Sequence, residues 1–379
     1  MMGYIAGLFL IWRLLLFAAS FLAEKFISFT PRFPYSDIFL IPSMLPRWIW
    51  GFGNFDGVHY LTIASRGYQA QFTQVYFPLF PLLLKYFYLI LPLGNPLVNG
   101  LILSNLLFLF SLYLFYLHLS TVVSENQSRW ILTFLVFFPT SFFFGSLYTE
   151  SLFLFLMLFS LYLGQQKKWW LAGLTAAFAS ATRIIGIFLW PVLLWQWLES
   201  RNQKQKKSLI SILKSPVCYI PPLGLIAYMV YLKVYFGDAL YFWHAQPVFG
   251  AGRSGSSIIL LPQVVYRYFK IFADISVTSE VFWITFLEFF LTVLTILLLI
   301  YAHRRKMPLS WLILAWPAIL LPTLTGTFSS MPRYVLLALP IYLGLASIPN
   351  LKVRSLVLFI SLLLQLVLTM LFTSGHWVA

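Results

Sequence analysis

The segment 54–68 contains the densest set of side chains that are able to do acid–base chemistry. Its pattern predicts a helix that Asn54 caps and Gly67 ends. Three polar or titratable side chains recur at helical spacing on one face of it: Asp56, His59 and Tyr60. A carboxylate on such a face is a candidate general base for an attacking hydroxyl group. Asp56 in a first helical turn equally complements the helix dipole, so residue chemistry alone leaves both interpretations open.

Two further acidic residues are candidates for binding a polar ligand. Glu150 stands at the start of an apolar run, where it is interpreted either as a carboxylate that binds a polar ligand or as a polar helix end at the membrane interface. Asp238 is expected to cap or brace a loop in preference to a catalytic role. A double-displacement reaction would need two cooperating carboxylates, and the sequence presents no evident pair.

The elements that must position these residues lie in a membrane. The chain has 379 residues, of which 61% are hydrophobic and only 9% charged, far from the composition of soluble domains. A soluble enzyme and a single-anchor protein are therefore excluded. The single cysteine, Cys218, excludes internal disulfides and a cysteine-rich metal site. The excess of 25 Lys and Arg over 10 Asp and Glu is interpreted as a topology signal, and no nucleic-acid partner is expected.

Apolar periodicity predicts an all-α polytopic membrane protein with about eleven spans. The predicted spans are 3–23, 98–120, 131–147, 150–164, 169–186, 187–198, 216–236, 282–302, 309–323, 334–349 and 355–373. The runs between 131 and 198 are short, and their pairing into spans is the weakest part of this count.

Basic residues predict the orientation of these spans. With a cytoplasmic N-terminus, five basic clusters fall on the cytoplasmic side of the eleven-span arrangement. They are Arg129, Lys167 with Lys168, Arg201 to Lys214, Arg304 to Lys306, and Lys352 with Arg354. Six of the acidic residues, including Asp56, Glu150 and Asp238, fall on the opposite side. We therefore expect a multi-pass protein of the cell (inner or plasma) membrane whose chemistry is extracytoplasmic.

Two outer segments, about 24–97 and 237–281, are too long for simple turns, and the first contains amphipathic stretches. The second contains the Gly-rich string 250–257, which is expected to be a flexible loop. It is not a P-loop, because the Gly-Lys-Ser/Thr ending and the preceding strand are both missing. We interpret residues 1–379 as one integral-membrane domain.

Several motifs, read in order, resemble the PIG-V mannosyltransferases, a branch of the integral-membrane GT-C glycosyltransferases. The sequence FDGVHYLTIASRGY resembles the family's W/F-D-x-x-H/Y-Y/F-L-x-I-A-x-x-G-Y signature. Shorter matches follow at YFPLFP (76–81), TESLF (149–153), FGDAL (236–240) with the later Ala245-Gln246, MPRY (331–334), and the ending 375–379. Where eukaryotic members read R-S-N-G, this chain has Arg183-Ile-Ile-Gly186, which puts the nature of the acceptor contacts in doubt.

The resemblance implies a GT-C-like fold and transfer of a mannosyl unit, with inversion, from a polyprenyl-phosphate donor to an extracytoplasmic lipid or glycan acceptor. A single displacement needs one base, and Asp56 is the residue expected to supply it. The departing phosphate needs cations. Arg333 is favoured for this role over an alternative as a lipid-headgroup anchor, while for Arg183 the two interpretations stay balanced. Arg253 is a third candidate, through its loop.

The resemblance also implies a wider substrate-binding set. Its members are His59, Tyr60, Glu150, Arg183, Asp238, Gln246, Arg253, Arg333 and Tyr334. The five histidines lack zinc-ligand spacing. We expect no cofactor and no metal site, although a divalent metal held by Asp56 stays open. A lipid-linked-sugar flippase or a secondary transporter is the alternative function, but the sequence has no internal repeat of the kind transporters show.

Overall fold

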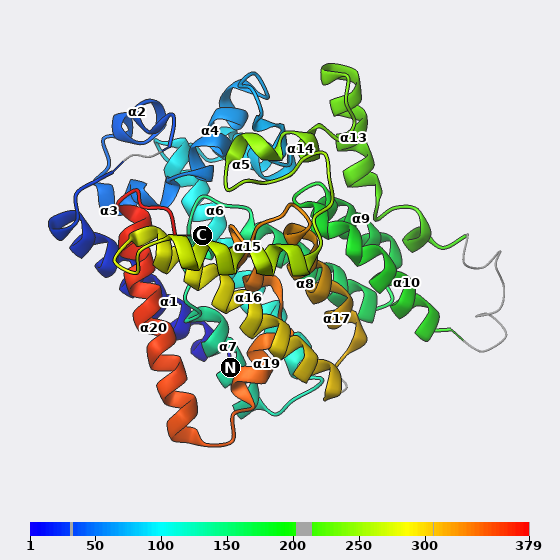
Figure 1. The fold of residues 1–379 in the computed structure, drawn as a ribbon. Coiled ribbons are helices and arrows are strands. Elements are labelled where there is room, and N and C mark those ends of the chain that lie inside the picture. Colours follow the sequence, from blue (N-terminus) through cyan, green and yellow to red (C-terminus); the bar gives the residue numbers. More distant parts are fainter. Residues whose placement is uncertain (31–32, 202–213, 306, 379) are drawn as a thin grey trace.

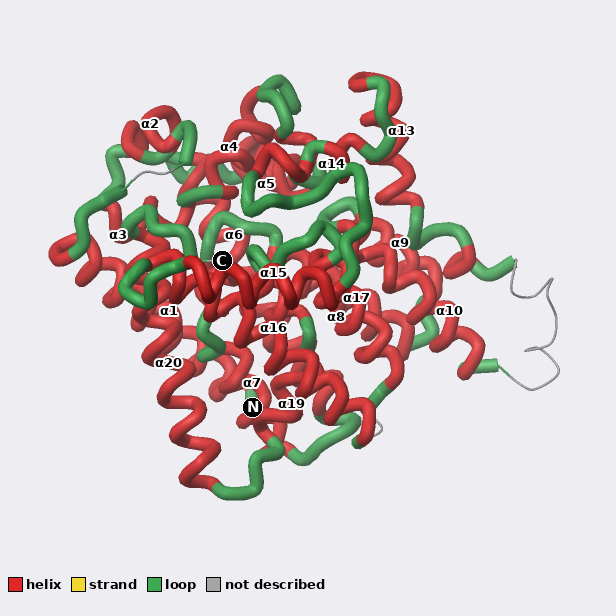
Figure 2. Tube along the Cα trace, in the orientation of Figure 1, coloured by secondary structure: helices red, strands yellow, loops and turns green. Residues whose placement is uncertain are grey.

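The computed structural model describes residues 1–30, 33–201, 214–305 and 307–378, and within these ranges the chain is helical without a strand (Figure 2). The predicted all-α class is thereby confirmed for the described residues. Two predicted basic clusters lie partly outside them, at residues 202–213 and at Lys306.

The helices are α1 (Met2–Phe26), α2 (Ser36–Phe39), α3 (Arg47–Trp50), α4 (Asp56–Arg66), α5 (Leu79–Ile90), α6 (Pro96–Leu119), α7 (Glu125–Val136), α8 (Glu150–Gln165), α9 (Trp169–Ser180), α10 (Leu189–Glu199), α13 (Leu223–Phe236), α14 (Tyr241–His244), α15 (Leu261–Asp274), α16 (Glu280–Arg304), α17 (Leu309–Thr323), α18 (Met331–Tyr334), α19 (Pro340–Ala346) and α20 (Leu351–Thr373). Figure 1 shows α4, α5 and α14 together at the top of the view, whereas the Leu351 end of α20 lies at the bottom.

Within the described residues, four helices are long and apolar enough to cross a bilayer, namely α1, α6, α16 and α20. Their 23 to 25 residues correspond to about 35 to 38 Å, which exceeds a hydrocarbon core of about 30 Å. Helix α13 and residues 241–249, bent by 79°, make a fifth candidate. The chain is thus a polytopic membrane protein.

Every predicted apolar run overlaps a helix, but seven of them form helices of only 7 to 16 residues. The count of eleven spans therefore stays a prediction.

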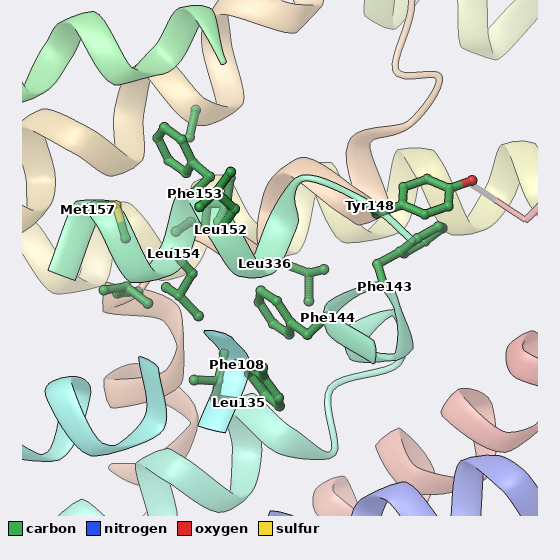
Figure 3. Close-up of a cluster of buried hydrophobic side chains, with 14 of the residues drawn as sticks. Phe108, Leu135, Phe143, Phe144, Tyr148, Leu152, Phe153, Leu154, Met157 and Leu336 are labelled. Carbon is green, nitrogen blue, oxygen red and sulfur yellow. The ribbon is translucent and has the colours of Figure 1, made fainter. Parts of the chain in front are cut away.

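Helix α8 forms the centre of the core, packed between α6 and α9. Around its first turns, aromatic and aliphatic side chains from α6, α7 and the 3-10 helix η4 (Ser141–Gly145) interdigitate (Figure 3). The rings of Phe108 and Phe144 stack at 4.5 Å. Inside a membrane such packing stabilises helix association by van der Waals contact, because lipid tails are as apolar as the side chains. This packing fixes the start of α8, where Glu150 lies.

Helix α4 begins one residue later than the sequence predicts. Phe55, not Asn54, is its N-cap residue, and Gly67 ends the helix at a φ of 69° as predicted. The Asn54 side chain is used elsewhere, because its Nδ2 donates to the Phe372 carbonyl of α20 at 2.8 Å. Asn54 therefore joins α4 to the C-terminal span and leaves the helix start to the backbone of Phe55.

Candidate active site

A cavity of about 630 Å³ lies among α4, the segment before α5, the 3-10 helices η5 (Ile184–Phe188) and η7 (Gln246–Phe249), and the start of α18. Eight of the ten predicted site residues line it. They are Asp56, His59, Tyr60, Arg183, Gln246, Arg253, Arg333 and Tyr334. Side chains distant in the sequence thus meet in one place, as Asp56 and Arg333 do across 277 positions.

The Asp56 carboxylate is the acidic group in the cavity wall. Its Oδ2 accepts a hydrogen bond from Arg333 Nη1 at 2.7 Å, and its Oδ1 accepts one from the Tyr76 hydroxyl at 3.1 Å. Its side chain is 17% exposed, so the carboxylate remains accessible from the cavity. Burial acts to raise the pKa of Asp56, but the charge and hydrogen bond of Arg333 outweigh it and hold the pKa below its ordinary value. Asp56 is therefore ionised at neutral pH.

Backbone strain at Phe55 fixes the direction of Asp56. Phe55 has φ 57° and ψ −113°, a conformation that residues with a side chain rarely adopt and that costs on the order of 1–3 kcal/mol. Its ring is held by Phe33 at 4.6 Å and by Trp377 at 5.2 Å between centroids. On the other side, the Tyr148 hydroxyl accepts from the Asp56 backbone N–H at 3.2 Å and donates to the Asn54 carbonyl at 2.9 Å.

Glu150 lies behind this wall and joins the two arginines. It is fully buried, and its Oε1 accepts from Arg183 Nη1 at 2.8 Å and from Arg333 Nε at 3.0 Å. The two carboxylates and the two guanidinium groups therefore balance in charge. Glu150 Oε2 has no hydrogen-bond partner among the described residues. Because burying an isolated charge is costly, Glu150 is retained here by its pairing with both arginines.

Arg253 also lines the cavity, but its polar contacts differ from those of Arg183 and Arg333. Its Nη2 donates to the hydroxyl of Ser330 at 3.2 Å and approaches that of Ser329 at 3.5 Å. It has no carboxylate within ion-pair distance in the described part of the chain. Among the three cavity arginines, Arg253 is thus the one that forms no ion pair in the described chain, although its charge interacts with the buried Glu288 carboxylate beyond ion-pair distance.

The Gly-rich string that carries Arg253, expected to be flexible, is held at several points. Arg267 of α15 donates to the carbonyls of Ala251, Gly252 and Gly326 at 3.0 to 3.2 Å. The Ser254 backbone N–H also donates to the Thr325 carbonyl at 2.7 Å. These bonds fasten the Arg253 loop to the loop that precedes α18.

The buried side chains of Tyr268 and Glu288 support the loop that precedes α18. The Tyr268 hydroxyl donates to Glu288 Oε2 at 2.7 Å and accepts from the Phe328 backbone N–H at 3.0 Å. Glu288 of α16, an ionisable residue inside a span, is therefore used to hold the segment that leads to Ser330 and Arg333.

His59 forms part of the aromatic wall. Its ring stacks on Tyr76 with centroids 5.0 Å apart, and its Nδ1 has no partner among the described residues. Burial lowers the pKa of His59, although the charge of Asp56 opposes this. The imidazole is therefore neutral at neutral pH and able to hydrogen-bond a ligand hydroxyl.

Asp238 is a predicted site residue that the cavity lining, as the described residues define it, does not include. Its Oδ1 accepts from the Leu240 backbone N–H at 2.9 Å, and its Oδ2 pairs with His244 Nδ1 at 2.6 Å. The hydrogen bond from His244 holds the pKa of Asp238 below its ordinary value. These contacts brace the loop that follows α13, and bracing is the role favoured from the sequence.

The sequence analysis assigned no role to Tyr76, Tyr148 and Ser330, although all three contact the site. Tyr76 begins the motif YFPLFP (76–81), and Tyr148 lies two residues before Glu150, so the sequence contains a feature that points to each of them. No feature of the sequence points to Ser330. Among the described residues, no three His, Cys, Asp or Glu side chains form a group able to hold a metal ion.

Comparison with known protein families gives one match. Residues 6–241, more than half of the chain, match the model of the family described as Mannosyltransferase (PIG-V). No curated protein matches the chain. The match includes Asp56, Glu150 and Arg183 together with the helices that position them. The chain therefore belongs to the PIG-V mannosyltransferase family.

Proposed function

We propose that this protein transfers a mannosyl unit, with inversion, from a polyprenyl-phosphate-linked donor to a lipid or glycan acceptor on the extracytoplasmic side of the cell membrane. The observation that carries this proposal is the ionised Asp56 carboxylate in the wall of a cavity that also presents an unpaired arginine. Membership of a mannosyltransferase family supports the sugar and the reaction class.

In the proposed reaction, the acceptor oxygen attacks the anomeric carbon of the donor on the face opposite the phosphate. Asp56 takes the proton from the acceptor hydroxyl as the new carbon–oxygen bond forms. The bond from the anomeric carbon to the phosphate oxygen breaks, and polyprenyl phosphate leaves with the bonding electrons. No nucleotide is consumed.

The fully buried position of Glu150 supports a single displacement. A double displacement requires a second carboxylate able to reach the sugar. Glu150 has no exposed surface, and its Oε1 is bound by two arginines. One accessible carboxylate is consistent with inversion.

Arg253 is the residue that we propose for the donor phosphate. Arg333 was favoured from the sequence, but its charge is already matched by Asp56 and Glu150. Arg253 has no such partner in the described chain, and the hydroxyls of Ser329 and Ser330 beside it are further donors to phosphate oxygens. Arg333 then acts as a positioning residue that aims Asp56.

The aromatic and aliphatic part of the cavity wall provides a path for the polyprenyl chain. Phe242, Trp243, Phe249, Leu321 and Pro322 all line the cavity, and the first three belong to or follow the bent α13–α14 unit. An isoprenoid chain that leaves between these elements enters the bilayer while its phosphate stays at Arg253. This arrangement requires a cytoplasmic N-terminus, as the basic clusters predict.

Donor binding to the purified protein tests this proposal without knowledge of the acceptor. We expect polyprenyl-phosphate-mannose to bind more tightly than polyprenyl-phosphate-glucose and much more tightly than GDP-mannose. A preference for GDP-mannose would reject the lipid-linked donor, and a preference for the glucosyl lipid would reject mannose. A flippase or transporter would bind the lipid but leave its glycosidic bond intact when acceptor membranes are added.

A further inference from the structure

A second hollow, of about 650 Å³, lies away from the candidate active site. It is formed by the turn between α8 and α9, the C-terminal end of α10, and the residues that lead into the 3-10 helix η6 (Pro216–Cys218). Four of its lining residues are basic, namely Lys167, Lys168, Arg201 and Lys214. No acidic residue lines it among the described residues.

The four cations are not neutralised by the protein. None of them has a carboxylate within ion-pair distance in the ranges that the structure describes. Glu199 lines a neighbouring hollow that shares Lys167 and Trp169, yet among the described residues it forms no ion pair with Lys167. Arg201 instead lies over the Trp197 ring at 4.7 Å. Such a concentration of uncompensated positive charge attracts an anion.

The hollow lies at the opposite end of α8 from the candidate active site. Helix α8 begins at Glu150, in the active-site network, and ends at Gln165, next to the hollow. Its 16 residues separate the two places by about 24 Å. Helix α9 returns from Trp169 at the hollow to Ser180, three residues before Arg183. In the topology that the basic clusters predict, the end of α8 next to the hollow is cytoplasmic.

A strip of apolar side chains leads from the hollow along α9. Trp170, Leu174 and Phe178, one helical turn apart, are 64%, 46% and 45% exposed. Leu223 and Ile226 of the adjacent α13 are 49% and 46% exposed. A membrane protein presents such a surface to lipid chains, so the cationic hollow and a lipid-facing strip are continuous.

We propose that this hollow binds the headgroup of an anionic phospholipid, whose acyl chains lie along the exposed strip of α9 and α13. The cations match the phosphate, and the exposed strip matches the acyl chains. Trp169 and Trp170 line the hollow, and indole rings favour the membrane interface. A free phosphate would use the cations but not the strip. This inference does not depend on the proposed mannosyl transfer.

The test is native mass spectrometry of the full chain titrated with phosphatidylglycerol or with phosphatidylcholine of the same acyl chains. The informative variant is the double substitution Lys168→Gln with Lys214→Gln. The matched control is Lys85→Gln with Lys270→Gln, which removes the same charge from exposed positions on α5 and α15. The melting temperature of each protein verifies that it is folded.

We expect the wild-type chain to bind phosphatidylglycerol selectively and the informative variant to lose about 25-fold in affinity, at about fivefold for each cation removed. The control variant is expected to bind as the wild type does, and inorganic phosphate is expected not to displace the lipid. An equal loss in the control would show attraction by net charge alone. Displacement by phosphate would show a site for a soluble anion, and the absence of selectivity for phosphatidylglycerol would show no site. Each of these three results overturns the proposal.

Discussion

At the scale of single residues, the decisive feature is that three arginines of the site have different ion-pair partners and therefore different roles. Arg183 and Arg333 share Glu150, and Arg333 also holds Asp56. Arg253 lies in the same cavity wall and forms no ion pair among the described residues; the nearest charge effect is that of the buried Glu288. Charge balance thus separates the residues that position the base from the residue that is free to bind an anion.

The lowered pKa of Asp56 predicts a specific pH dependence. Because the ionised form is the base, transfer should persist as the pH falls until it passes below the ordinary Asp pKa of about 3.9. The ion pair likewise stabilises the fold above that value, and this stability is lost as the pH falls through the lowered pKa. Substituting Arg333→Gln removes the charge that lowers the pKa and leaves the burial that raises it. We expect the acid limb of kcat/KM to move to higher pH.

The matched control for this shift is Arg253→Gln, which removes a cavity arginine that does not contact Asp56. Its acid limb should coincide with that of the wild type. The melting temperature of Arg333→Gln verifies that this variant is folded. If its acid limb of kcat/KM also coincides with that of the wild type, then Arg333 does not control the ionisation of Asp56.

Arg253 itself is expected to act on donor binding. Substituting Arg253→Gln should weaken binding of polyprenyl-phosphate-mannose by about 10-fold to 150-fold, the range for one charge-assisted hydrogen bond. Arg253→Lys should recover part of the loss, since it restores the charge without the planar fork. Titration with a fluorescent lipid-linked donor measures both. If Arg253→Gln binds the donor as tightly as the wild type does, then another cation binds the phosphate.

At the scale of elements, the start of α8 joins the core to the site. The packed rings of α6 and η4 hold its first turn, and Glu150 in that turn holds Arg183, which precedes η5, and Arg333 of α18. Short helices are suited to this role because their ends lie within the fold, where polar groups from several elements can meet.

This arrangement predicts that Glu150 matters for stability as well as activity. Glu150→Gln leaves Arg183 buried without a full counter-charge, and breaking a buried ion pair costs about 3–5 kcal/mol. Glu125→Gln is the control, because its ion pair with Arg129 is about half exposed and contributes about 0.3–0.5 kcal/mol. Thermal unfolding in detergent compares the two. Equal melting temperatures for the two variants would contradict the network.

Much of this organisation follows from the sequence, and the rest depends on long-range contacts. Apolar runs predict the helices because burial imposes their composition, and Asp56 is conspicuous in its motif. The Asp56–Arg333 pair spans 277 positions, and no local pattern encodes it. The cap at Phe55 is set by rings from distant segments. The fastening of the Arg253 loop uses backbone carbonyls, which have no signature in residue type.

At the scale of the whole molecule, the fold separates two polar places by the length of α8. The active-site cavity and the basic hollow lie at opposite ends of this helix. The predicted topology, with α1, α6, α16 and α20 among the spans, assigns the two places to different compartments.

This topology predicts opposite accessibility for two engineered cysteines. In a Cys218→Ser background, Asp238→Cys should react with a membrane-impermeant maleimide in intact cells. Lys352→Cys, at the start of α20, should react only after the membrane is permeabilised. The same pattern in reverse would place the candidate active site in the cytoplasm and reject the extracytoplasmic reaction.

The most direct test of the central claim is the transfer of labelled mannose from polyprenyl-phosphate-mannose into membranes that contain the acceptor, measured for the wild type and for Asp56→Asn, with donor binding measured in parallel. If Asp56 is the base, the variant should bind donor with nearly unchanged affinity, and transfer should fall about 10²-fold to 10⁴-fold. The Asp238→Asn control should transfer as the wild type does. Near-wild-type transfer by Asp56→Asn would contradict the account.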